Sequence, residues 1–95
     1  MTQYVYLDTM QNLCLRLNNA FKVTRPDDQP LIDLYDAAEE GFFRRKEKLE
    51  VGIAGVSVSD KQLERVKGFE EYVVKAENDA AYKLRESEVE KRTTA

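Results

Sequence analysis

Hydrophobic residues recur every three or four positions near the start of the chain, the spacing of one face of an α-helix. This first stripe consists of Tyr6, Met10, Leu13, Cys14, Leu17, Ala20 and Phe21. The pattern predicts an amphipathic helix over about residues 4–22. Its start is left open between Thr2 and Thr9, and Pro26 ends it because proline disfavours a helical conformation at the residue before it.

A second helix is predicted over about residues 29–50, after the loop sequence TRPDDQP. Asp27 or Asp28 can cap it, and Pro30 falls in the first turn, where a missing N–H costs nothing. Its apolar stripe consists of Leu31, Leu34, Tyr35, Ala38, Phe42 and Leu49. Acidic residues dominate its first half and basic residues its end, which the helix macrodipole favours.

The sequence VSVS at residues 56–59 alternates like a short strand, but the residues after it favour a helix start. Ser59 and Gln62 have the spacing of a capping box, in which each side chain bonds the other residue's backbone N–H. A third helix is therefore predicted over about residues 60–88, with fraying expected over 86–95. Its predicted core positions are Leu63, Val66, Phe69, Val73, Ala76, Ala80 and Leu84.

Three amphipathic helices in 95 residues indicate one all-α domain spanning residues 1–95. The expected architecture is a small antiparallel three-helix bundle, or a helical hairpin with an added N-terminal helix. The mix of 42% hydrophobic and 35% charged residues is typical of a folded domain and is too apolar for disorder.

The chain offers little catalytic chemistry. It has no histidine, and its single cysteine, Cys14, lies on the apolar side of the first helix without a base to activate it. Cys14 is therefore interpreted as core filler. No metal site and no cofactor are expected, because zinc and carboxylate-bridged metal sites need ligand sets that the sequence lacks. No enzymatic activity is expected either, because the sequence offers neither a histidine base nor an activated nucleophile.

The net charge is only −3, so the chain as a whole has no strong attraction for nucleic acid. No apolar run approaches the length of a membrane span, and the start MTQYVYLD has no secretory pattern. A cytoplasmic location without membrane contact is the expectation.

Several large apolar residues fall outside the three stripes and suggest a surface that contacts another chain. They are Val5, Leu15, Ile32, Phe43, Tyr72, Val74 and Tyr82. The run FFRRKEK at residues 42–48 adds basic residues beside two of the aromatic rings. The candidate partner-binding residues are Phe43, Arg44, Arg45, Tyr72 and Tyr82.

The predicted function is that of a small protein–protein interaction module, an adaptor, accessory protein or inhibitor that docks through a helical face. The alternative is a self-associating structural subunit, such as a homodimer. A less favoured alternative is a nucleic-acid binder that uses the basic patch at residues 44–48, since arginine and lysine beside aromatics occur in such sites.

Overall fold

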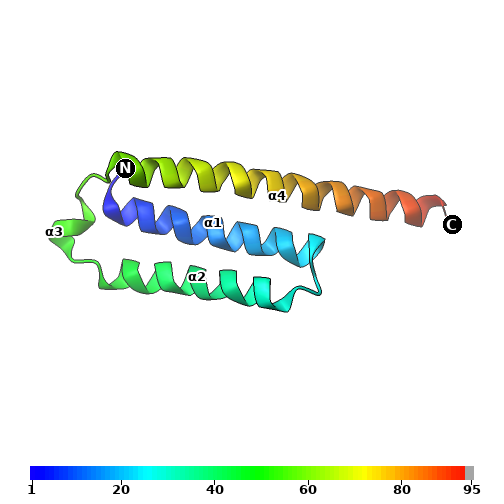
Figure 1. Ribbon diagram of the computed structural model, residues 1–95, viewed down its shortest axis with the longest axis horizontal. Helices are drawn as coiled ribbons and strands as arrows, with labels where there is room; N and C mark the ends of the chain where they lie inside the picture. The colour runs from blue at the N-terminus through cyan, green and yellow to red at the C-terminus, as the bar shows by residue number, and fades with distance from the viewer. Residues whose placement is uncertain (94–95) are drawn as a thin grey trace.

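Three long helices and one short helix make up the described part of the chain (Figure 1). The computed structural model describes the backbone of residues 1–93 and the side chains of residues 1–88. The helices are α1 (Gln3–Thr24), α2 (Gln29–Lys48), α3 (Val51–Ala54) and α4 (Asp60–Thr93). The all-α class is confirmed, and within the described backbone the one β-type feature is a single bridge between Thr2 and Ser57.

The helix starts follow the local sequence signals. Thr2 caps α1, where its hydroxyl accepts a hydrogen bond from the backbone N–H of Val5. Asp28 caps α2 through the N–H of Leu31, so the second of the two predicted aspartates is the cap.

α4 continues to Thr93, past the predicted end near residue 88. Residues 94–95 of the predicted fraying segment lie outside the described residues, and the fraying stays a prediction.

The capping box at the start of α4 is confirmed. The Ser59 hydroxyl accepts from the N–H of Gln62 at 3.3 Å, and the Gln62 side-chain oxygen accepts from the N–H of Ser59 at 3.0 Å. The Gln62 amide also exchanges two hydrogen bonds with the side chain of Gln3 in α1. The Gln62 side chain thus caps the start of α4 and also hydrogen-bonds α4 to α1.

Replacing Ser59 with alanine is expected to lower the free energy of unfolding by about 1 kcal/mol, because the N–H of Gln62 loses its acceptor. Urea titration followed by circular dichroism would measure this change. Ser57→Ala is the matched control, since Ser57 is exposed and lies outside the box. An unchanged midpoint for Ser59→Ala would show that the box contributes no stability.

The arrangement of the helices differs from the expected bundle. α1 lies between α2 and α4, antiparallel to α2 and parallel to α4 (Figure 1). Among residues 1–93, no Cα atom of α2 comes within 8 Å of one in α4. The bundle is therefore open on one side, and α1 is the helix that joins the other two.

The apolar face of α1 is buried, as predicted, and it supplies most of the buried hydrophobic residues. All seven residues of its predicted stripe are buried. Val66, Val73, Ala76 and Ala80 of α4 are also buried, and Phe69 packs against them. Leu63 and Leu84, also predicted as core, are exposed. Leu84 follows Lys83, which lies beside the end of α1 and the α1–α2 loop, and α4 continues past that loop (Figure 1).

The contact face of α2 is rotated from the one the sequence predicts. Ile32, predicted to lie outside the stripe, is only 6% exposed, whereas Leu34, predicted as core, is 60% exposed. Leu31, Tyr35, Phe42 and Leu49 are half-buried at the edge of the core. α2 therefore contacts α1 with one edge of its apolar stripe and leaves the other edge at the surface.

Candidate docking surface

The five predicted partner-binding residues do not form one surface. Phe43, Arg44 and Arg45 lie in the C-terminal half of α2, whereas Tyr72 and Tyr82 lie on α4. The part of α2 that carries Phe43 lies beside the beginning of α1, because α1 and α2 run antiparallel (Figure 1). Tyr72 instead lies beside Phe21, close to the other end of α1.

Phe43 belongs to a small cluster that spans α1 and α2. The Lys46 ammonium group lies 5.7 Å from the centre of the Phe43 ring and 5.9 Å from the centre of the Tyr4 ring. It also donates a hydrogen bond of 2.9 Å to the carboxylate of Asp8. We call Tyr4, Asp8, Phe43 and Lys46 the aromatic patch. Both aromatic residues are less than half exposed but open to solvent, Tyr4 at 45% and Phe43 at 42%.

Lys46 is the centre of this patch. Its side chain is only 16% exposed, although it carries a charge. The hydrogen bond to Asp8 raises the pKa of Lys46 and outweighs the opposing effect of desolvation. The ammonium group therefore stays protonated and attracts the faces of both rings. The Lys46 ammonium group thus lies beside both exposed aromatic rings.

A hollow of about 470 Å³ lies beside Phe43. Its other lining residues are Gln11, Asp36, Glu39 and Glu40. Three carboxylates and no basic side chain line it, but Glu40 is paired with Arg44, so Asp36 and Glu39 supply the unbalanced negative charge next to the ring. A basic side chain of a partner fits this hollow better than an acidic one.

Three of the four basic side chains at residues 44–48 already interact with other side chains of this chain. Arg44 forms an ion pair of 2.6 Å with Glu40, and Lys46 is bonded to Asp8. The guanidinium of Arg45 lies 5.3 Å from the centre of the Phe42 ring. These contacts reduce the positive field that phosphate groups would need, so the geometry does not favour the nucleic-acid alternative.

The two tyrosines of α4 have different surroundings. The Tyr72 ring meets the Phe21 ring edge to face, with centres 6.5 Å apart, and it lines a notch of about 310 Å³ between α1 and α4. Tyr72 thus covers the core while half of it stays exposed. Tyr82 is more exposed than Tyr72, and it lies just under one turn beyond Asp79, the last residue of α4 that lines this notch.

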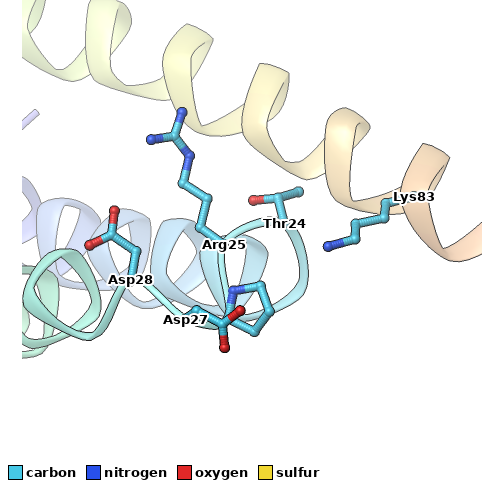
Figure 2. Close-up of a pocket in the computed structure, with 6 residues that line it drawn as sticks. Thr24, Arg25, Asp27, Asp28 and Lys83 are labelled. Carbon is cyan, nitrogen blue, oxygen red and sulfur yellow. The ribbon is translucent and has the colours of Figure 1, made fainter.

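A larger, open notch lies where α4 passes the α1–α2 loop (Figure 2). Lys83 reaches from α4 toward Thr24, and Arg25 rises toward α4 on the other side. Asp27 points away from both, and Asp28 is already used in capping α2. The charges are mixed and the side chains mostly exposed, so this notch has no arrangement that favours catalysis.

Of the seven large apolar residues that fall outside the predicted stripes, six are exposed and one, Ile32, is buried in the core. The sequence did not single out Tyr4 or Asp8 as parts of a site. Asp8 is separated from Lys46 by 38 positions, and no local pattern links them. Only the antiparallel packing of α1 and α2 brings the two residues together.

Cys14 is core filler, as predicted. It is 1% exposed, and burial, with a smaller contribution from Glu39, raises the pKa of its thiol to about 11. The thiol is therefore protonated near neutral pH and is a poor nucleophile. Within the described residues, no group of three or more histidine, cysteine, aspartate or glutamate side chains could hold a metal ion.

None of the helices in the described part of the chain is long and apolar enough to cross a membrane. Comparisons with known protein families, with curated proteins and with solved structures find no match.

Proposed function

We propose that this chain is a protein–protein interaction module that docks on its partner through the aromatic patch. The observation that carries the proposal is the pair of exposed rings, Tyr4 and Phe43, held around one largely buried lysine side chain. Exposed, rigid aromatic side chains are typical of the residues that dominate binding energy at protein interfaces. The role is non-enzymatic, and adaptor, accessory and inhibitory roles all use such a surface.

The chemistry of the surroundings defines the kind of partner. An apolar side chain of the partner would pack on Phe43, and a neighbouring lysine or arginine would lie near Asp36, Glu39 and Glu40. A partner helix that presents one large apolar residue next to a basic residue meets both requirements. A cytoplasmic location is part of this proposal.

Replacing Phe43 with serine is expected to weaken partner binding by roughly 30-fold or more, the effect of losing a residue that dominates an interface. The measurement combines capture from native lysate with titration of the captured protein against the purified chain. Leu63→Ser is the matched control, because Leu63 is also 42% exposed but lies on α4.

A photoreactive phenylalanine analogue at position 43 should cross-link to the captured partner, and the same analogue at position 63 should not. Equal binding by the Phe43→Ser, Leu63→Ser and unchanged chains would contradict the proposal. Cross-linking from position 63 alone would place the docking surface on α4 instead.

A further inference from the structure

The hollow beside Phe43 is bounded by two pairs of hydrogen-bonded side chains that cross from α1 to α2. Asn18 of α1 donates a hydrogen bond of 2.6 Å to the carboxylate of Asp36. Gln11 of α1 donates one of 3.4 Å to the carboxylate of Glu39. Gln11, Asp36 and Glu39 all line the hollow. Because a carboxylate can accept several hydrogen bonds, both acids keep acceptor positions for a group that enters the hollow.

The two amides that hold these carboxylates each have an oxygen without a donor. The side-chain oxygens of Gln11 and Asn18 are buried, and no group in the described part of the chain donates a hydrogen bond to either. Asn18 as a whole is only 2% exposed, and its side chain points toward the hollow, where it bonds Asp36. A buried polar atom without a partner costs free energy, so this wall favours a ligand that brings N–H donors.

The charges around the hollow favour a cation. Glu40 is already paired with Arg44. Asp36 and Glu39, in contrast, form no ion pair with any side chain that the structure describes. Their neighbours on α1 are neutral amides, which fix the positions of the carboxylates without balancing their charge. The hollow therefore attracts a group that combines positive charge with N–H donors.

A guanidinium group meets these requirements better than a metal ion or an ammonium group. The hollow, at about 470 Å³, is much larger than one metal ion, and its acidic side chains do not form a metal-binding group among the described residues. A guanidinium group is planar, has more N–H donors than an ammonium group and stacks on aromatic rings. The ring of Phe43 lies at the hollow and is 42% exposed. Lys46, which lies near this ring, does not repel the ligand strongly, because Asp8 balances its charge.

We propose that the hollow binds the guanidinium group of an arginine side chain on the partner protein. The proposal rests on the proposed function, since the same partner packs an apolar residue on Phe43. The Gln11–Glu39 bond is long and easily replaced. A half-turn of the Gln11 amide places its oxygen beside Glu39, and both oxygens then accept from neighbouring N–H groups of the arginine. Asp36 accepts from another N–H group, and the guanidinium plane stacks on Phe43.

Titration of the full chain with N-acetyl-arginine amide, followed by heteronuclear NMR, tests the site without the partner. The side-chain NH₂ signals of Gln11 and Asn18 should shift and saturate at millimolar concentrations, because so small a ligand binds weakly. N-acetyl-citrulline amide, which has a similar shape but no charge, should bind at least about tenfold more weakly. No saturable shift with the arginine probe, or an equal response to the citrulline probe, would overturn the proposal. A response to Ca²⁺ in place of arginine would also overturn it.

The variant Asp36→Asn with Glu39→Gln tests the two acids. It removes both charges and keeps the side-chain shapes and the oxygens that accept from α1, so its melting temperature should stay close to that of the unchanged chain. The arginine probe should bind it at least about tenfold more weakly. Asp33→Asn with Glu47→Gln is the matched control, since both residues are exposed on α2 and lie outside the hollow. Equal weakening in the two variants would attribute the effect to net charge and overturn the site.

The captured partner separates this proposal from the proposed function. The variant Asp36→Asn with Glu39→Gln should weaken partner binding by about tenfold or more, because the partner's arginine loses its acceptors of opposite charge. Binding that depends on Phe43 but not on Asp36 and Glu39 would overturn the arginine site and leave the docking surface in place. Binding that depends on none of the three would contradict both proposals.

Discussion

Replacing Leu17 with alanine is expected to lower the free energy of unfolding by about 3 kcal/mol, within the range measured for buried leucines. Leu17 is 0% exposed and lies in the face of α1 that meets the core residues of α4. The substitution removes apolar contacts and leaves a cavity that flanking helices fill only in part. For a domain of this size the loss corresponds to a fall in melting temperature of roughly 12–24 °C.

Leu15→Ala is the matched control, since Leu15 lies on the same helix but is 46% exposed. It should change the free energy of unfolding by less than about 1 kcal/mol. Urea titration of both variants measures the difference. Similar losses at the two positions would contradict the orientation of α1.

Replacing Phe21 with alanine is expected to cost about 4 kcal/mol of stability, a larger loss than at Leu17 because a whole ring is removed. The Phe21 ring lies 5.6 Å from Tyr35 of α2 and 6.5 Å from Tyr72 of α4, measured between ring centres. Because α2 and α4 do not approach each other through their backbones, this ring is a bridge between them. Its loss should loosen both flanking helices near the end of α1.

Thermal unfolding followed by circular dichroism tests this expectation, with hydrogen exchange to show which amides lose protection. Amides near Tyr35 and near Tyr72 should both exchange faster in the Phe21→Ala chain. Tyr82→Ala is the control, because Tyr82 is 66% exposed and should leave stability nearly unchanged. Loss of protection in α4 alone would show that Phe21 does not hold α2.

The sequence predicts the helices well because the signals for them are local. The caps of α2 and α4 are the predicted ones, and each capping contact joins residues three positions apart. The face of α1 is predicted largely but not completely, since Leu7 and Asn18 are also buried, and the reason for the success is that this helix is covered from two sides. All of its stripe is therefore buried, and the apolar period alone identifies it.

The orientation of α2 could not be predicted, because it depends on which neighbour the helix meets. Periodicity places the centre of the stripe between Leu31, Leu34 and Phe42, but only one edge contacts α1. Ile32 consequently replaces Leu34 in the core. One edge of the stripe is exposed because the bundle is open on one side. No local sequence pattern predicts that arrangement.

The candidate site was predicted in part for the same reason. Phe43 is identifiable because it is one of seven large apolar residues outside the three stripes and belongs to the run FFRRKEK, and it is exposed. The basic run beside it was interpreted as a charged surface, but Glu40 and Asp8 pair with two of its members. The pairing with Glu40 follows from helical spacing, whereas the pairing with Asp8 required the packing of α1 on α2.

The claim on which the account depends is that the aromatic patch lies outside the core and is free to bind. The free energy of unfolding of the Phe43→Ser chain tests it most directly. We expect a loss of no more than about 1 kcal/mol, because the ring is 42% exposed and gives up its contact with Lys46. A loss of about 2 kcal/mol or more would place Phe43 in the core and contradict the proposed docking surface.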